Sequence, residues 1–131
     1  MPIATSGKIC VALVDDDESL CRSLARLLRA AGIQAITYSS SEAFLSDTKQ
    51  PPFDCLVLDV QMLGMSGLEL QKKLKAAGIA VPVIFITAYD DPQVREQALS
   101  QGCVSYFRKT DSGSELLEAI RLAAARPSTP A

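Results

Sequence analysis

Residues 8–19 read KICVALVDDDES, an apolar run that leads directly into four acidic side chains. Ionised carboxylates on neighbouring residues repel one another, so this concentration of charge needs a compensating group. The apolar part has the composition of a buried strand. Beyond the acids, a helical pattern has an apolar face formed by Leu20, Leu24, Leu27, Leu28 and Ala31. The stretch predicts a strand, an acidic loop and a helix, in that order.

The same succession of an apolar run and a helical segment recurs along the chain. It predicts strands at 8–14, 34–38, 55–58, 83–87 and 105–108. Alternation of this kind is typical of βαβ units around a parallel sheet. We therefore expect a doubly wound α/β fold of five strand–helix pairs.

Polar residues mark where these helices begin. Asp91-Pro92 fits an N-cap followed by proline at the first helical position, and Gly32 ends the first helix. In a capping box, a serine and a glutamate three residues later bond to each other's backbone amide. Three such pairs are predicted, namely Ser39 with Glu42, Ser66 with Glu69, and Ser112 with Glu115.

Composition limits the classes of function. The 131 residues are 48% hydrophobic and 21% charged, as in one soluble globular domain, and the net charge is −2 without a basic cluster. We therefore expect no nucleic acid bound by this domain. No apolar run approaches the length of about 20 residues that spans a membrane, and no signal peptide is evident. The expected location is the cytoplasm, without membrane contact.

The expected domain covers residues 8–125. Residues 1–7 form an N-terminal extension, and 126–131, rich in Pro, Ser and Thr, form a tail or the start of a linker. The sequence has no histidine, which excludes hydrolases with a histidine base and imidazole metal sites. Its cysteines lie far apart in apolar segments and are expected to be buried and reduced, at Cys10, Cys21, Cys55 and Cys103.

Chemically active side chains follow four of the expected strands. In parallel α/β sheets, ligands bind beyond the carboxyl ends of the strands. At these ends stand Asp15, Asp16, Asp59, Thr87 and Lys109. Each has an ordinary structural interpretation, as a helix cap, a turn residue, a strand residue or a solvated charge. Their coincidence at one edge favours a functional site.

Three carboxylates without imidazole or thiolate suit Mg²⁺ or Mn²⁺. A divalent cation would also relieve the repulsion within the acidic run. Together with a lysine and a hydroxyl, this set indicates a phosphoryl-transfer site. An aspartate would be the nucleophile and would form an acyl phosphate.

The chain resembles the receiver domains of two-component response regulators over about residues 8–125. The matching motifs are VDDD at 14–17, LDVQM at 58–62 with GMSG at 64–67, IFITA at 84–88 and YFRK at 106–109. The stretch YSSSEAFL at 38–45 further resembles the nitrogen-fixation type, whose receivers are commonly joined to a LuxR-type DNA-binding domain. The resemblance implies a flavodoxin-like sheet with strand order 2-1-3-4-5.

The resemblance also implies roles for single residues. Asp59 would take a phosphoryl group from a sensor histidine kinase in a Mg²⁺-dependent reaction. Lys109 would pair with the phosphoryl oxygens, and the Thr87 hydroxyl and the Ala88 backbone N–H would bind the others. Such a protein is a signalling phosphoacceptor and not a classical enzyme. Self-phosphorylation from small phosphodonors and autodephosphorylation are expected.

In the same family pattern, Asp16, Asp59 and the backbone carbonyl of Gln61 would hold Mg²⁺ directly, and Asp15 would hold it through water. Asp17 is then left to cap or flank the first helix.

Tyr106 matches the family's switch aromatic, which turns inward as Thr87 moves toward the phosphate. The alternative is that Tyr106 is only a half-buried strand aromatic. Gln61 and Tyr89 match positions that tune dephosphorylation. Phosphorylation-dependent homodimerisation through the fourth helix and fifth strand is a further hypothesis.

The sequence departs from the family pattern twice. Thr110 follows Lys109 where the family generally has a cis proline, and a cis bond at a non-proline residue costs about 2.5–4 kcal/mol, so we predict a trans bond. Leu63 stands where the family usually has proline, which predicts a more mobile loop after Asp59.

Three rival interpretations remain. Asp15 and Asp17 also fit a haloacid-dehalogenase-like phosphatase, with Asp15 as nucleophile and Asp17 as general acid, but Asp59 is then unexplained. A flavodoxin-like nucleotide domain would need a glycine-rich or hydroxyl-rich loop after the first strand. A receiver-like module that only contacts proteins, without phosphorylation, stays open because of the altered Lys109-Thr110 junction.

Overall fold

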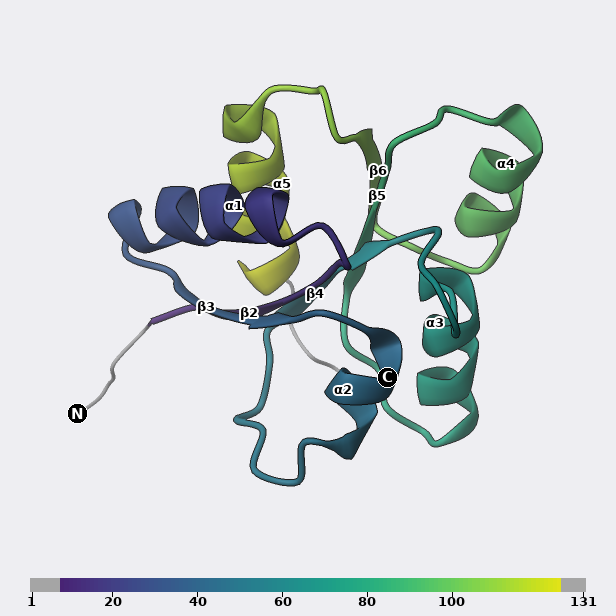
Figure 1. Cartoon of the computed structure of the whole chain (residues 1–131). Coiled ribbons are helices and arrows are strands. Elements are labelled where there is room, and N and C mark those ends of the chain that lie inside the picture. Colours follow the sequence, from purple (N-terminus) through teal and green to yellow (C-terminus); the bar gives the residue numbers. More distant parts are fainter. Residues whose placement is uncertain (1–7, 126–131) are drawn as a thin grey trace.

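The computed structural model describes residues 8–125, so expectations for 1–7 and 126–131 lie outside the described residues. Strands and helices alternate along the chain (Figure 1). Their bounds are β2 Cys10–Val14, α1 Glu18–Ala30, β3 Gln34–Tyr38, α2 Ser41–Ser46, β4 Cys55–Asp59, α3 Gly67–Ala76, β5 Val83–Thr87, α4 Pro92–Ser100, β6 Ser105–Arg108 and α5 Gly113–Ala125.

The strands form one parallel sheet in the order β3-β2-β4-β5-β6. In chain order this is 2-1-3-4-5, so the predicted topology is confirmed. Val14 pairs with both Tyr38 and Leu58, and Leu58 pairs with Phe85. The carboxyl ends of the central strands therefore lie level with one another, which brings the residues after them to one edge.

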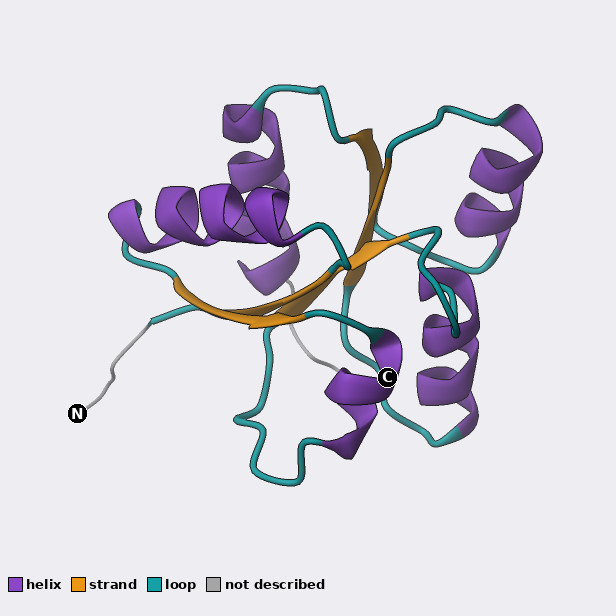
Figure 2. Cartoon of the chain, viewed as in Figure 1, coloured by secondary structure: helices purple, strands orange, loops and turns teal. Residues whose placement is uncertain are grey.

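Helices cover both faces of the sheet (Figure 2). Helices α1 and α5 lie on one side, and α2, α3 and α4 lie on the other (Figure 1). Alternate residues of each central strand enter different cores: Leu13 packs with Leu28 and Ile120, whereas Val14 packs with Leu70 and other apolar groups. Because both faces are covered, strands β2, β4 and β5 are buried along their whole length.

Several predicted caps are confirmed. The Asp17 carboxylate accepts a hydrogen bond from the Leu20 N–H and caps α1. Ser66 and Glu69 form the capping box of α3, and Asp91 caps α4 immediately before Pro92. The acidic run is thus divided, because its third aspartate serves the helix.

Two of the predicted capping boxes are wrong. The backbone is still extended at Ser40, so α2 begins one residue later than expected and Ser40, not Ser39, caps it through the Ala43 N–H. Glu42 then stands at the second helical position and its carboxylate accepts from the Met65 N–H. Before α5, Ser112 accepts from the Ser114 N–H in place of the Glu115 N–H.

The remaining differences are small. The first strand begins at Cys10 rather than at residue 8, and the third extends to Asp59. All four cysteines are free, but Cys103 is only partly buried, which corrects the expectation for that residue. The Lys109–Thr110 peptide bond is trans, as predicted. Within residues 8–125, no helix is both long and apolar enough to cross a membrane.

Candidate functional site

The predicted site residues converge at the carboxyl edge of the sheet because backbone pairing continues past the strands. The Asp15 N–H donates to the Tyr38 carbonyl at 3.1 Å, and the Lys109 N–H donates to the Thr87 carbonyl at 2.8 Å. These bonds fix the residue after β2 and the residue after β6. Asp15 and Asp59 are buried, at 2% and 3% exposure.

Lys109 binds both buried carboxylates. Its Nζ lies 2.9 Å from Asp15 Oδ2 and 3.1 Å from Asp15 Oδ1. The same atom lies 3.1 Å from Asp59 Oδ2. The ammonium supplies the compensating charge that the acidic run requires.

A third carboxylate completes the cluster. Asp16 is exposed, and one oxygen from each of Asp15, Asp16 and Asp59 lies within 4.8 Å of the other two. Asp16 Oδ2 also lies 3.4 Å from the Leu63 backbone nitrogen, its hydrogen-bond donor. One lysine cannot neutralise three carboxylates, so the cluster keeps a net negative charge when all are ionised.

Burial and neighbouring charge change the acidity of this cluster. Burial, followed by the charge of Asp15, raises the pKa of Asp59 to about 7, although Lys109 opposes the shift. Burial works against the charge of Lys109, but hydrogen bonds to Asp15 and Asp59 raise its pKa overall. The structure thus retains a charged lysine beside a carboxyl group that resists ionisation.

The donor set fits a hard divalent cation. All the acidic ligands offer oxygen, which is what Mg²⁺ and Mn²⁺ prefer. The buried atom Asp15 Oδ2 touches the Lys109 ammonium but accepts no hydrogen bond of good geometry from the described residues. An under-coordinated buried oxygen in a cluster of net negative charge is the arrangement that a cation and its bound water would complete.

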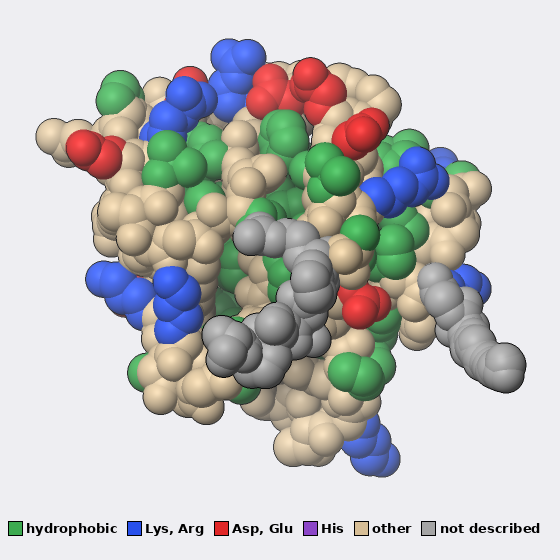
Figure 3. Space-filling model, turned by 180° about the vertical axis from the view of Figure 1, so that it is seen from behind, with side chains coloured by type: hydrophobic (Ala, Val, Ile, Leu, Met, Phe, Trp, Pro, Cys, Tyr) green, Lys and Arg blue, Asp and Glu red, His purple; other side chains and the backbone are tan. Residues whose placement is uncertain are grey.

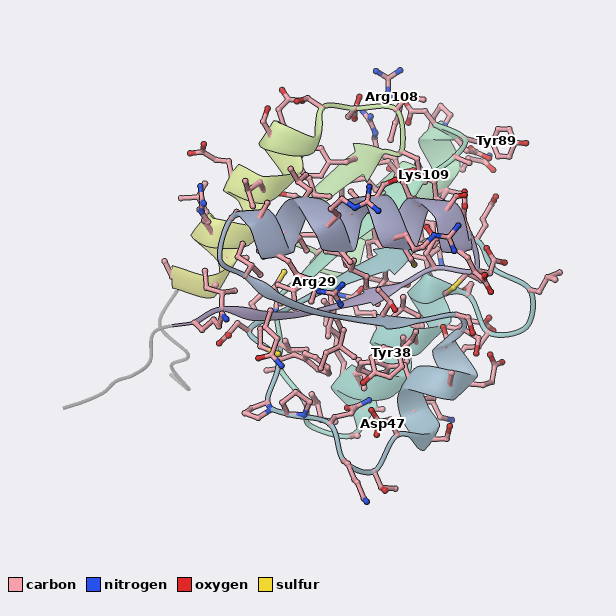
Figure 4. All side chains as sticks on the ribbon, turned by 60° about the vertical axis from the view of Figure 1, so that its left-hand side comes forward. Arg29, Tyr38, Asp47, Tyr89, Arg108 and Lys109 are labelled. Atoms are coloured by element: carbon pink, nitrogen blue, oxygen red, sulfur yellow. The ribbon has the colours of Figure 1, made fainter. Side chains whose placement is uncertain are left out.

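The Thr87 hydroxyl is engaged by the following loop. Its Oγ1 donates to the Tyr89 carbonyl at 2.7 Å and accepts from the Tyr89 N–H at 3.2 Å. Ala88 and Tyr89 are exposed, and the Tyr89 ring points away from the body of the molecule (Figure 4). The structure therefore places Thr87 at the predicted edge, with its hydroxyl held by the β5–α4 loop.

Tyr106 lies on β6 beside this loop. Its hydroxyl is buried and has no hydrogen-bond partner within residues 8–125. Burial raises its pKa, and the neighbouring Thr87 hydroxyl works in the opposite direction. The Arg95 guanidinium lies 5.3 Å from the centre of the ring. The Tyr106 hydroxyl is therefore buried beside Thr87, and its role as the switch aromatic stays a prediction.

The loop after Asp59 carries the remaining predicted residues. The Gln61 N–H donates to Asp59 Oδ1 at 3.3 Å, and the Gln61 side chain is exposed. Leu63 is 87% exposed. Greater mobility of this loop stays a prediction.

Sequence reasoning missed two contacts around the site. One is the bond from the Met65 N–H to Glu42, and the other is the position of Arg95 over Tyr106. Glu42 had a plausible local role in a capping box, which concealed its long-range partner. The side chain of Arg95 gives no local signal of its partner, because the contact depends on how α4 packs against β6.

Comparison with known proteins decides the family. A family model described as the response regulator receiver domain matches residues 11–121. The chain belongs to this family. The three-aspartate cluster is consistent with the phosphoacceptor site of a receiver domain.

Similar proteins agree with this assignment. The response regulator protein TmoT of Ectopseudomonas mendocina is 39% identical over 113 residues, which are 86% of this receiver domain chain and 51% of that protein. The transcriptional regulatory protein FixJ of Azorhizobium caulinodans is 34% identical over 116 residues, which are 88% of this chain and 55% of that protein. The receiver chain thus spans about half the length of the curated relatives it matches.

Solved structures also resemble this receiver domain. The crystal structure of FixJ-N is 31% identical, covers 95% of this chain and 100% of its own, and superimposes with a TM-score of 0.85. A response regulator receiver protein from Burkholderia phymatum is 46% identical over 92% of this chain and 98% of its own, with a TM-score of 0.78. The rival phosphatase interpretation is not favoured, because Asp17, its general acid, caps α1.

Proposed function

We propose that this receiver domain accepts a phosphoryl group on Asp59 from a phosphohistidine of a sensor histidine kinase. The observation that carries the proposal is the Lys109 ammonium, bound to the buried carboxylates of Asp15 and Asp59 within a three-carboxylate cluster. A structural ion pair would need one carboxylate per lysine. Two buried carboxylates and an exposed third are excess negative charge, which favours cation and phosphate chemistry.

In the reaction, an Asp59 carboxylate oxygen attacks phosphorus, and the phosphorus–nitrogen bond to the kinase histidine breaks as the new phosphorus–oxygen bond forms. Lys109 stabilises the charge on one part of the phosphoryl group. The Thr87 hydroxyl and the Ala88 N–H bind the phosphoryl oxygens that Lys109 does not contact. Asp16, Asp59 and the Gln61 carbonyl would hold Mg²⁺, with Asp15 acting through water. When bound, the cation offsets negative charge on the transferred group.

The acyl phosphate would then act as a switch. Its phosphoryl group carries a charge of about −1.5 to −2 in place of the single carboxylate charge, and this draws the Thr87 hydroxyl away from the Tyr89 carbonyl. Tyr106, whose hydroxyl is already buried beside Thr87, moves further into the space that Thr87 leaves. The changed α4–β6 face then favours another partner or a second copy of the domain, with a coupling of about 1–3 kcal/mol.

The remaining roles follow from position. The exposed side chains of Gln61 and Tyr89 stand beside the site and would tune the rate at which water removes the phosphoryl group. Because the relatives are about twice as long, we propose that the receiver controls a LuxR-type DNA-binding domain in a cytoplasmic protein. On the face shown in Figure 3, acidic and basic side chains are interspersed. This face therefore has no continuous basic patch of the kind that binds nucleic acid, in agreement with the proposal that the receiver itself binds none.

A labelling experiment tests the proposal. The protein is incubated with Mg²⁺ and acetyl phosphate, and the acyl phosphate is located by mass spectrometry, with Asp59→Asn as the control variant. We expect label on Asp59 that is absent from the control. Label on Asp15 would support the phosphatase alternative. Absence of any label, together with no response to the acyl-phosphate mimic beryllofluoride, would favour the module that only contacts proteins.

A further inference from the structure

The loop between β4 and α3 carries Gln61 and follows the proposed phosphoacceptor, yet few bonds hold its middle. The Val60 N–H donates to the Ile86 carbonyl at its start, and the Ser66 N–H donates to Glu69 at its end. Between these points, the Gln61 N–H donates to Asp59 at 3.3 Å and the Leu63 N–H donates to Asp16 at 3.4 Å, and both bonds are long. The shortest side-chain bond to the middle of this stretch comes from Glu42, on α2.

The contact of Glu42 with the loop is specific. Its Oε2 accepts a hydrogen bond from the Met65 N–H at 2.9 Å. The same oxygen lies against the preceding residue of the loop, where a Cβ added to Gly64 would be 2.8 Å away. Gly64 has a φ of +78°, so the chain turns sharply where the carboxylate packs. The Met65 N–H keeps the pKa of Glu42 below its ordinary value.

Glu42 is not needed for the cap that its sequence motif predicts. Ser40 caps α2 through the Ala43 N–H, and the Glu42 carboxylate extends to a loop 23 residues away in sequence. The loop also lacks the proline that would restrict its backbone at position 63. A carboxylate bond from a neighbouring helix is a second way to restrict it.

We propose that Glu42 is a positioning residue that orders the phosphoacceptor loop and thereby places the Gln61 carbonyl and Asp16 for the divalent cation. The proposal rests on the proposed function of Asp59. Glu42 does not touch the reacting atoms, so its effect passes through the backbone of residues 61–65. Loss of an outer group that orients metal ligands typically lowers metal affinity by about 10- to 100-fold, and we expect the lower end of that range.

Three variants test this role. Glu42→Ala removes the acceptor, and Glu42→Gln retains an acceptor oxygen without the charge. Ser40→Ala removes the cap of the same helix but leaves the contact with Met65, so it controls for general loss of α2 stability. Hydrogen exchange of the Met65 amide is measured in the absence of metal. The affinity for Mg²⁺ is measured by calorimetry. The rate of phosphorylation by acetyl phosphate is measured as a function of Mg²⁺ concentration.

We expect Glu42→Ala to lose protection at Met65 and to raise the half-saturating Mg²⁺ concentration by about 10-fold, with a smaller change in the rate at saturation. Glu42→Gln should recover most of the protection at Met65 and most of the Mg²⁺ affinity. Ser40→Ala should change neither the protection at Met65 nor the half-saturating Mg²⁺ concentration by more than about 2-fold. Wild-type behaviour of Glu42→Ala, or equal defects in Glu42→Ala and Ser40→Ala, would overturn the proposal. Failure of the wild-type chain to label Asp59 would instead overturn the proposed function, while exchange at Met65 would still report on the loop.

Discussion

Helices α1 and α4 each follow a strand that ends at the candidate site, α1 after β2 and α4 after β5. The two helices are nevertheless packed against the sheet very differently. Helix α1 buries Cys21, Ala25 and Leu28, whereas α4 buries only Ala98 among its nine residues. Leu99 of α4 remains 54% exposed. One half of the site is therefore built on a firmly packed helix, and the other half leads into a helix with little buried apolar surface.

The difference would allow one site to combine a fixed part with a part that responds to phosphorylation. Asp15 and Asp16 lie between β2 and the well-packed α1, so the acids have a rigid support. Thr87 leads into a loop held by its own bond to Tyr89 and by an exposed ion pair of 3.3 Å between Arg95 and Asp90. Exposed ion pairs contribute little, about 0–1 kcal/mol, so moving α4 should cost little.

The largest expected effect tests the packing difference directly. Leu28→Ala, in α1, should lower the free energy of unfolding by about 2–5 kcal/mol, because Leu28 is fully buried. Leu99→Ala, in α4, should change it by no more than about 0.5 kcal/mol. Urea unfolding followed by circular dichroism measures both. Equal losses in the two variants would contradict the comparison.

The acidic half should show a pH-dependent stability. The pKa of Asp59 is raised from 3.8 to about 7, so its folded carboxyl group keeps a proton that the unfolded chain has lost. Metal-free protein should therefore lose stability as the pH rises from about 4 to about 7. Asp59→Asn removes this loss and should be more stable than wild type by about 2 kcal/mol at pH 8, with no difference at pH 3.

Chemical denaturation across this pH range, with and without Mg²⁺, measures the effect. Bound cation should reduce the difference, because it stabilises the ionised carboxylate. A constant difference between wild type and Asp59→Asn at all pH values would show that burial of the charge is not its cause.

Hydrogen exchange should distinguish the two helices in the unmodified protein. Amides of α4 should exchange at least about 10-fold faster than matched amides of α1, because local opening exposes less apolar surface in α4. The comparison uses the central turn of each helix, away from fraying ends. Similar protection in both helices would show that α4 is held by contacts other than buried side chains.

The smallest effect concerns Arg95. Its side chain is about half exposed, paired with Asp90 and placed over the Tyr106 ring. Arg95→Ala should cost at most about 1 kcal/mol of stability. It should nevertheless increase motion of the Tyr106 ring, which NMR line shapes report, and Arg26→Ala on the exposed face of α1 is the matched control. An unchanged ring would show that Arg95 does not restrain Tyr106.

Much of this structure could be predicted because its signals are local or repetitive. The apolar strands and the N-caps Asp17, Ser66 and Asp91 follow from neighbouring residues alone. The convergence of Asp15, Asp59 and Lys109 follows from the rule that parallel strands place their carboxyl ends at one edge. These features need no knowledge of how the side chains finally pack.

The contacts that escaped prediction depend on distances between elements. The sequence spacing of Glu42 fits a capping box. Because α2 begins one residue later than expected, the Glu42 carboxylate instead binds the Met65 N–H. The bond between Thr87 and Tyr89 requires the conformation of a loop that no periodic pattern describes. The sequence determines which segments become helices and strands, but it does not determine which of several possible partners a polar side chain binds.

The central claim is that chemistry at Asp59 moves the α4–β6 side while the α1 side stays in place. Hydrogen exchange of every amide, measured with Mg²⁺ in the presence and absence of beryllofluoride, tests it most directly. We predict altered exchange at the β5–α4 loop, α4 and β6, with little change in the core turns of α1. Changes concentrated in α1, or a protein that binds beryllofluoride without any change in α4 and β6, would contradict it.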